Sequence, residues 1–446
     1  MFKVTREDMR LATGTRKAAT KPHSGALAAA LLLAAADPVA AQEAGTNLRR
    51  FLYDEATATL HLRSYFLDRT NPSPPNNVAW AGGGWVGYET GWLHNVLRLG
   101  VVGYTTQPIR APSDTDGTAL LKPGPYGFWT LGEAYASIKL HHQVFTAYRQ
   151  HLDEFEVNPQ DDRMIPNLFE AYALRGTVGH VSYFAGYVTR MKLRNESVFD
   201  NMAQTAINQY GRGQSVPSTG MYLGSLRYMP DPDLTLRASS YHVPDILSSG
   251  YGDVIWSAPM PEHLKLVMSG YFMVQGTSSH TLIGKPFSTW SAGGRAILGW
   301  QDVSVWTAFM QTGSASPYRT PYGQWIGYGK MITKDFNRAN EHAFQIGATW
   351  DFAGLGIHGL TFRGSGTFGS GATDSDTHAH LTQNNEFDLD LEYRFTAESW
   401  PDWLKPLALR ARAGLVQENL NGQPSASSEY RLILNYEVQF RGGTRR

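Results

Sequence analysis

Residues 387–395 read FDLDLEYRF, and their side chains alternate strictly between apolar and charged. The charged set consists of Asp388, Asp390, Glu392 and Arg394. Successive side chains of a β-strand point to opposite faces, so a period of two is typical of a strand rather than of a helix. This stretch therefore predicts a strand with one face in apolar surroundings and the other in polar surroundings.

The same alternation recurs on both sides of this stretch. Residues 407–415, LALRARAGL, and residues 432–440, LILNYEVQF, repeat it, and beyond Gln42 the dominant period is two. Counting such runs between turn residues places eighteen strands near 55–66, 78–90, 93–105, 128–141, 143–150, 168–176, 179–191, 218–228, 233–241, 251–258, 263–273, 289–299, 301–311, 343–352, 358–369, 385–397, 406–417 and 429–440.

The links between these runs differ in length in a regular way. Short links at 91–92 and 142 contrast with long ones at 106–127, 151–167, 192–217, 274–288 and 312–342. Short turns at one rim and long loops at the other are typical of bacterial outer-membrane barrels. The predicted fold class is all-β: a transmembrane antiparallel β-barrel of about 18 strands, with short periplasmic turns and long extracellular or inward-folded loops.

The composition argues against several other classes. Lys and Arg together number 39, as do Asp and Glu, so the chain lacks the basic excess of a nucleic-acid binder. It has no cysteine, so neither a disulfide nor a thiolate metal site can form. Aromatic residues make up 12% of the chain, charged residues 17%, and 45 residues are glycine, a balance typical of transmembrane barrels.

The first 41 residues predict a cleaved signal peptide. Basic residues precede a short apolar run, Gly25–Ala36, and Val39–Ala41 offers small residues for cleavage before Gln42. An apolar run of this length is too short to cross a hydrocarbon layer of about 30 Å as a helix. An N-terminal membrane anchor is the alternative. Residues 42–446 are then expected to form a single barrel domain.

The alternation also orients the barrel wall. An arginine on the lipid side costs about 2–4 kcal/mol at the bilayer midplane, whereas a polar lumen accepts it. Arg410 and Arg412 should therefore project into the lumen, as should Arg63 and Arg363 on their own strands. A further basic row, expected to line the pore, comprises Arg190, Lys192 and Arg194.

Such a lumen would hold water, because a barrel of this size is too wide for its own side chains to fill. Inward arginines would make a positively charged path, and the guanidinium group suits carboxylates because it binds them through two parallel hydrogen bonds. The alternative is that these arginines are ordinary lumen residues paired with Asp388, Asp390, Glu392 and Glu437.

One long link carries a charge pattern of its own. Residues 151–167, HLDEFEVNPQDDRMIPN, contain Asp153, Glu154, Glu156, Asp161, Asp162 and Arg163. Folded into the lumen opposite basic walls, such an acidic loop would narrow the channel and create a transverse field. The alternative, which the charges alone favour, is an external loop whose charges keep it in water.

Several segments resemble the OprD family of substrate-specific outer-membrane porins. They are LHLRSYFLDRT (60–70), YRQHLDEFEVNPQDDRMIPNLFEAYAL (148–174), AGYVTRMKLRNESVFDNM (185–202), KDFNRANEHAFQIGATWDFAGLGIHGLTFR (334–363) and EYRLILNYEVQF (429–440). Together they span nearly the whole mature chain. In one departure from the family pattern, Phe440 is followed by the tail RGGTRR, Arg441–Arg446, where the family's chain ends at or near its last aromatic or apolar residue.

The resemblance implies an eighteen-stranded pore, monomeric or in loose homotrimers, with a constriction formed by residues 151–167 and a second inward loop within 312–342. It also implies a basic ladder along the wall, and the matching positions are Arg63, Arg149, Arg363, Arg410 and Arg412. The family's substrates are small carboxylates, including amino acids, peptides and aromatic acids. The expected partners are outer-membrane lipid, such solutes, and the barrel-assembly machinery, which would read the strand ending at Phe440.

Chemistry beyond transport finds little support in the sequence. No catalytic or nucleotide-binding motif follows a strand and opens a helix, and we expect no cofactor. His378 and His380 would share one strand face, but zinc needs a third or fourth ligand, so we expect no metal site. The leading hypothesis is a passive outer-membrane channel, not an enzyme, that is selective for small carboxylates. The alternatives are a general, non-selective diffusion porin and an outer-membrane barrel enzyme or adhesin.

Overall fold

The structure is a computed structural model that describes residues 45–211, 218–278, 282–420 and 423–443. Residues 50–446 make up one compact unit, and residues 45–49, the described part of the other, are helical. The predicted signal peptide, residues 1–41, lies outside the described residues, as do the last three residues of the predicted tail.

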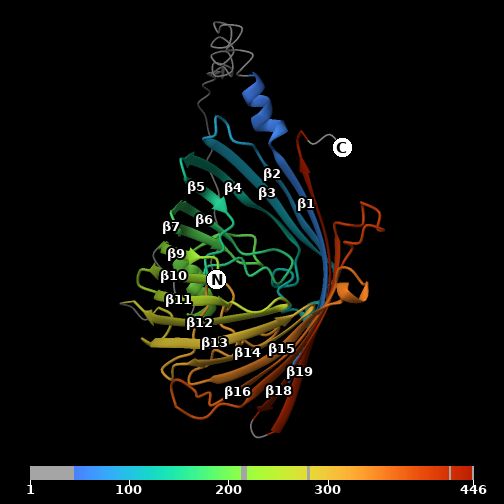
Figure 1. Cartoon of the computed structure of the whole chain (residues 1–446). Helices are drawn as coiled ribbons and strands as arrows, with labels where there is room; N and C mark the ends of the chain where they lie inside the picture. The colour runs from blue at the N-terminus through green and yellow to red at the C-terminus, as the bar shows by residue number, and fades with distance from the viewer. Residues whose placement is uncertain (1–44, 212–217, 279–281, 421–422, 444–446) are drawn as a thin grey trace, which may run out of the picture. The chain divides into compact units, whose positions relative to one another are not determined.

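Over the described residues, eighteen long strands and one two-residue strand pair in a single antiparallel sheet (Figure 1). The long strands are β1 (Thr57–Thr70), β2 (Asn77–Glu89), β3 (Leu97–Arg110), β4 (Phe128–Leu140), β5 (Gln143–Gln150), β6 (Leu168–Val178), β7 (Val181–Lys192), β9 (Met221–Asp231), β10 (Leu234–Val243), β11 (Leu247–Ala258), β12 (Leu264–Thr277), β13 (Ser288–Trp300), β14 (Val303–Thr312), β15 (His342–Asp351), β16 (Leu360–Ser370), β17 (Asn384–Arg394), β18 (Leu407–Leu420) and β19 (Gln423–Arg441). The short strand β8 (Asp200–Asn201) pairs with β7. Short helical turns are η1 (Arg50–Asp54), η2 (Ser113–Thr115) and η3 (Phe352–Leu355).

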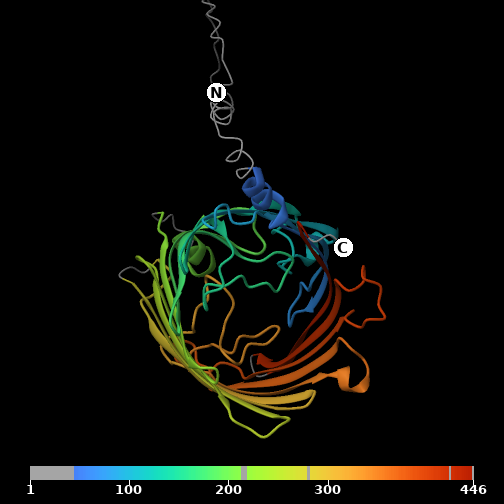
Figure 2. The same cartoon turned by 45° about the horizontal axis from the view of Figure 1, so that its top comes forward.

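The sheet closes into a barrel because β1 pairs with both β2 and β19. The β1–β19 register runs without a break from Thr57 opposite Arg441 to Thr70 opposite Ser428. Figure 2 shows the resulting ring of strands. The prediction of an antiparallel barrel of about 18 strands is therefore confirmed.

The wall sorts its side chains as the alternation predicts. Leu389 and Leu409 are 51% and 40% exposed on the outer face of β17 and β18. Asp390, Arg410 and Arg412 face a cavity inside the barrel. The apolar outer face can meet hydrocarbon, and the charged groups remain on the side that holds water.

Three long connections contribute to packing inside the barrel (Figure 2). They are residues 151–167, the described residues 193–211 and 218–220, and residues 313–341, which we call loop 151–167, loop 193–220 and loop 313–341. Leu152 and Val157 of the first, Met202 of the second and Tyr322 of the third share one buried apolar cluster with side chains of the wall strands. These loops therefore fill part of the lumen.

Loop 193–220 contains a helix, α3 (Met202–Tyr210), that the sequence analysis did not predict. The side chain of Asn201 caps it by accepting a hydrogen bond from the backbone N–H of Gln204 at 2.9 Å. Among the described residues, no helix combines the length and the apolar character needed to cross a membrane.

Candidate functional site

A cavity of about 1180 Å³ lies inside the barrel, between the inward loops and the wall. The arginines that line it are Arg175, Arg227, Arg237, Arg295, Arg363, Arg410, Arg412 and Arg431. Three residues of the predicted ladder, Arg363, Arg410 and Arg412, are thus brought together at one surface. Arg63 and Arg149 lie outside the lining of this cavity.

One carboxylate holds two of these arginines. Asp390 accepts a hydrogen bond of 2.7 Å from Nε of Arg410, and its Oδ2 lies 3.0 Å from Nε of Arg412. In the strand register Arg412 on β18 is the direct cross-strand neighbour of Asp390 on β17, and Arg410 lies two residues along β18 on the same face. Arg363 on β16 is the direct neighbour of Asp390 on the other side. Pairing with wall carboxylates, the alternative raised from the sequence, therefore applies to Arg410 and Arg412.

Three other arginines of the cavity, Arg227, Arg295 and Arg363, form no ion pair with a carboxylate among the described residues. The guanidinium group of Arg363 lies 4.5 Å from the ring centroid of Trp306, and that of Arg295 lies 4.5 Å from the ring centroid of Tyr328. Stacking on the face of an aromatic ring stabilises a cation without neutralising its charge. Both charges are therefore available to an anion in the cavity. The sequence analysis did not select Arg295.

Loop 151–167 is fixed to β1 by an ion pair. Arg63 donates to the two carboxylate oxygens of Asp161 at 2.6 and 3.2 Å. It also donates to the carbonyl oxygen of Arg163 at 2.6 Å and to Oδ1 of Asn435 at 2.8 Å. The Arg63 side chain, only 9% exposed, thus connects the wall to this loop.

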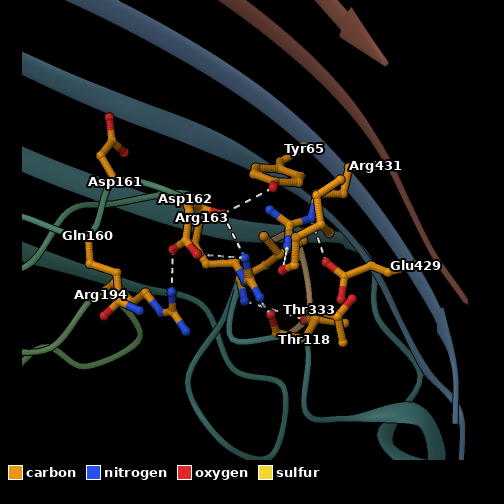
Figure 3. A network of polar contacts seen from close by, with 12 residues as sticks. Tyr65, Thr118, Gln160, Asp161, Asp162, Arg163, Arg194, Thr333, Glu429 and Arg431 are labelled. Carbon is orange, nitrogen blue, oxygen red and sulfur yellow. Dashed lines mark hydrogen bonds and ion pairs between the residues drawn. The ribbon is translucent and has the colours of Figure 1, made fainter. Parts of the chain in front are cut away.

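A buried polar network continues from this contact (Figure 3). Asp162 forms ion pairs with Arg163 and Arg194, and the hydroxyl of Tyr65 donates to the carbonyl oxygen of Asp162 at 3.0 Å. Burial alone would raise the pKa of Asp162, but the two guanidinium groups outweigh it and hold this pKa below its ordinary value. Burial lowers the pKa of Arg163, whose Nε donates to the carbonyl oxygen of Thr118 at 2.9 Å.

The other acidic residues of loop 151–167 are divided between the cavity and the interior. Asp153 and Glu154 line the cavity, and Glu154 accepts a hydrogen bond of 2.5 Å from Ser225 and lies 3.7 Å from Arg175. Burial raises the pKa of Glu154. Glu156 is buried away from the cavity lining.

Carboxylates of β17 hold loop 313–341 against the wall. Asp388 accepts a hydrogen bond from the backbone N–H of Ile332 at 2.8 Å. Glu386 accepts from the N–H groups of Thr333 and Lys334, both at 2.7 Å. The three donors belong to consecutive residues, so this segment of loop 313–341 is fixed against β17 at the positions that precede Asp390.

The two charged loops also bind each other. The side-chain amide of Asn158 donates to the carbonyl oxygen of Gln324 at 3.1 Å, and the N–H of Gln324 donates back to Oδ1 of Asn158 at 2.9 Å. The N–H of Asn158 donates to the carbonyl oxygen of Tyr322 at 3.3 Å. Loop 151–167 and loop 313–341 are therefore one connected assembly within the barrel.

The predicted basic row on β7 does not line the cavity. Lys192 is wholly buried, and its amine donates to the carbonyl oxygen of the next residue at 2.8 Å. A β-bulge shifts the β6–β7 register just before Arg190, and the alternation expected for this row ends there. Arg190 and Arg149 both lie near Glu170, at 3.7 and 2.9 Å.

His378 and His380 lie in the connection between β16 and β17. Within the part of the chain that the structure describes, no three His, Asp or Glu side chains are grouped so that they could hold a metal ion.

The sequence model of the family described as "outer membrane porin, OprD family" matches residues 50–440. The chain belongs to the OprD family. A search of curated proteins gives no match. Among solved structures, Pseudomonas aeruginosa OpdK, determined with vanillate, is 18% identical with a TM-score of 0.75, over 87% of this chain and 100% of that chain. OccK9 (OpdG) of the same organism is 19% identical with a TM-score of 0.77 over the same shares. Acinetobacter baumannii OccAB1 is 15% identical with a TM-score of 0.76, over 88% of this chain and 98% of that chain.

Membership of the OprD family makes this protein an integral outer-membrane porin, a channel for small solutes whose outer wall contacts lipid. The solved structures share its fold. Both the family and the fold are those of channels rather than of enzymes.

Proposed function

We propose that this OprD-family porin passes small organic anions that carry a carboxylate, and that the arginines of the cavity select them. The observation that carries this proposal is the presence of Arg295 and Arg363 in the cavity lining without a carboxylate partner among the described residues. A guanidinium group that is already paired attracts an anion weakly, because its charge is largely balanced. An unpaired one raises the local concentration of anions.

Passage would proceed by exchange of contacts. A solute carboxylate bound by Arg363 would lie close to Arg410 and Arg412, because all three arginines surround Asp390. Each step would replace one charge-assisted hydrogen bond with another of similar strength, so no contact becomes a deep trap. Diffusion down a concentration gradient is then sufficient for transport.

The pairing of Arg410 and Arg412 with Asp390 favours a second candidate, a general diffusion porin. If Arg295 and Arg363 contribute little, the lumen is close to electrical balance and solutes are sorted by size alone. Selectivity measurements distinguish the two candidates.

The first test is the reversal potential of the purified channel in a planar bilayer under a KCl gradient. We expect a preference for chloride over potassium in the wild type, and a reduced preference in the double variant Arg295→Gln with Arg363→Gln. The matched control is Arg98→Gln with Arg394→Gln, which removes two positive charges outside the cavity lining and should leave the preference unchanged. A wild-type channel that prefers cations, or neither ion, would contradict the proposal.

The second test is liposome swelling with carboxylates and uncharged sugars of matched size. Carboxylates should enter faster than the sugars, and the Arg295 and Arg363 double variant should narrow the difference. Replacing Arg410 and Arg412 with alanine should narrow it less, because Asp390 already balances part of their charge. Equal permeation by all solutes would favour the general porin.

A further inference from the structure

Loop 151–167 reaches two walls that lie opposite each other. Asp161 binds Arg63 on β1, and Glu156 binds Ser249 on β11. Along the order of the sheet, eight long strands separate β1 from β11 in either direction: β2 to β7 with β9 and β10 on one side, and β12 to β19 on the other. The six residues from Glu156 to Asp161 therefore cross the lumen.

Glu156 stands at the tip of a tight turn. The N–H of Glu154 donates to the carbonyl oxygen of Val157 at 2.9 Å, and the N–H of Val157 donates back at 3.0 Å. Phe155 adopts a left-handed φ of 55°, which lets the chain reverse within the turn. The turn presses the Glu156 side chain against the wall, where the residue is only 6% exposed.

Three side chains meet there in a closed triangle of oxygen atoms. Oε1 of Glu156 lies 2.9 Å from Oγ of Ser249 and 2.7 Å from the hydroxyl of Tyr318 in loop 313–341. The Ser249 and Tyr318 oxygens are 2.6 Å apart. This one site therefore joins loop 151–167, loop 313–341 and the wall.

The contacts around Glu156 outnumber the protons that the two hydroxyl groups can donate. Besides its contacts in the triangle, Oγ of Ser249 lies 2.8 Å from Oε2 of Glu156 and 3.1 Å from the carbonyl oxygen of Val274, and this hydroxyl has one proton to donate. A protonated Glu156 adds a third donor to the group, so fewer pairs of oxygen atoms are left without a proton between them.

The surroundings of Glu156 also favour the neutral form. The other titratable group facing it is Tyr241 on β10; β11 presents Ser249, and β12 presents the carbonyl oxygen of Val274, 3.1 Å from Oγ of Ser249. Within the described residues, no lysine or arginine forms an ion pair with Glu156. Burial raises the pKa of Glu156 to about 7, although the hydrogen bonds from Tyr318 and Ser249 lower it in part.

We propose that Glu156 is a positioning residue, which in its protonated form seats loop 151–167 on β11 and which releases that end of the loop when it loses the proton. Asp161 and Arg63 hold the other end, so the loop stays attached to β1 while the end at β11 moves. The aperture beside the cavity then fluctuates, and the open-channel current fluctuates with it.

The direction of the pH dependence follows from the two states. A released Glu156 in water has the ordinary pKa of 4.5, whereas the seated one has a pKa of about 7. The contact of Glu156 with Ser249 and Tyr318 is therefore most stable below pH 4.5. Its stability decreases as the pH rises to about 7 and is constant above that. The balance between released and seated forms changes by a factor of roughly 300 at most across this interval.

The test is single-channel recording of the full-length protein from about pH 4 to about pH 8, with the frequency of current transitions as the readout. In the wild type this frequency should rise up to about pH 7 and then level off. Glu156→Gln keeps the shape of the side chain without its titration, and its frequency should stay low at every pH. The matched control Asp153→Asn removes one exposed carboxylate from the same loop and should keep the wild-type pH profile.

A second variant weakens the contact of Glu156 with the wall and leaves Glu156 able to titrate. Tyr318→Phe removes one hydrogen-bond donor, so the transition frequency should rise at every pH while the pH dependence persists. Three results would each overturn the proposal. They are a wild-type transition frequency that does not change with pH, a Glu156→Gln channel with the same pH dependence as the wild type, and a Tyr318→Phe channel with the same transition frequency as the wild type. The readout is independent of ion preference: a channel that conducts with this pH profile but does not prefer anions would contradict the proposed function alone.

Discussion

Arg63 of β1 and Asp161 of loop 151–167 form a two-point ion pair, with nitrogen–oxygen distances of 2.6 and 3.2 Å. The pair lies across the ring from Glu156, and the loop is therefore held at both ends of its path through the lumen. The size of the channel then depends on contacts that are far from the cavity arginines in sequence.

Arg63→Gln should give a larger and noisier conductance, because the end of the loop at β1 loses its charged contacts. Charge-assisted hydrogen bonds contribute about 1.5–3 kcal/mol each, and the lower value applies here because Asp161 is 40% exposed. Asp161→Asn should have a smaller effect, since Arg63 keeps its bond to the carbonyl oxygen of Arg163. Single-channel conductance measures both, and identical values for Arg63→Gln and the wild type would show that the pair does not hold the loop.

Asp390→Asn should increase the preference for anions. The substitution removes the carboxylate that Arg410 and Arg412 share, so Arg412 loses its ion pair and Arg410 keeps only a contact of 3.7 Å with Glu392. Both arginines then add to the positive charge that Arg363 presents to the cavity. Asp376→Asn, which removes one carboxylate from the connection between β16 and β17, is the control. If the reversal potential of Asp390→Asn moves toward that of a cation-selective channel, the arginines do not determine selectivity.

The preference for anions should weaken as salt concentration rises. The charges face a water-filled cavity, where the screening length falls from about 10 Å at 0.1 M to about 3 Å at 1 M. Reversal potentials measured at these two mean concentrations, with the same gradient ratio, give the comparison. A preference independent of salt would indicate sorting by size rather than by charge.

Asp162→Asn should expose loop 151–167 to proteolysis. Arg163 would lose the carboxylate that compensates its buried charge, a loss that costs about 3–5 kcal/mol for fully buried pairs and less here because Asp162 retains some exposure. Trypsin cleaves after arginine, so digestion of the detergent-purified variant should yield a cut after Arg163 that the wild type resists.

Acid should release this network only at low pH. Its guanidinium neighbours hold the pKa of Asp162 below the ordinary 3.8, so the stability that Asp162 contributes is present above pH 3.8 and is lost as the pH falls through its lower value in the folded protein. The wild-type channel at about pH 4 should therefore show no loosening from this source. Frequent transitions that appear at pH 4 and disappear on returning to pH 5 would count against the network.

Leu389→Arg should reduce the unfolding free energy in liposomes by about 2–4 kcal/mol, because it places a charge on the lipid face near the middle of β17. Ser365→Arg places the same side chain in the cavity lining of the neighbouring strand and should cost much less. Urea titration followed by tryptophan fluorescence compares them, and equal losses would mean that the two faces are not distinguished by their surroundings.

Much of the barrel could be predicted from the sequence, because strand periodicity is local. The predicted strand at 143–150 coincides with β5, and that at 128–141 differs from β4 by one residue. The inward direction of Arg410 and Arg412 followed from the apolar residues that alternate with them, Leu409, Ala411 and Ala413. Helix α3 was missed because its nine residues include Thr, Ile and Asn, which favour helices weakly, and its stability comes from burial of Met202 and Ile207 inside the barrel.

The candidate site was less predictable, because it depends on contacts between distant segments. The predicted β7 row does not reach the cavity at Lys192, because this residue is buried under the start of loop 193–220, where its amine donates to the carbonyl oxygens of Leu193 and Glu196. Arg295 follows two glycines and precedes two apolar residues, so the sequence around it lacks the alternation of charged and apolar residues that marks an inward face. No local pattern indicates that Glu156 meets Ser249 and Tyr318, since the three come from separate parts of the chain.

The pairing of β1 with β19 bears on how the protein is made. The first and last strands of the wall are neighbours, so each has an open edge until the other is present. A truncated chain that lacks β19 would leave one edge of β1 and one edge of β18 with unsatisfied backbone N–H and C=O groups, which invite pairing with other chains. Both edges must therefore be shielded during assembly until β1 and β19 pair, and a premature stop codon that removes β19 should yield an aggregating product rather than a smaller pore.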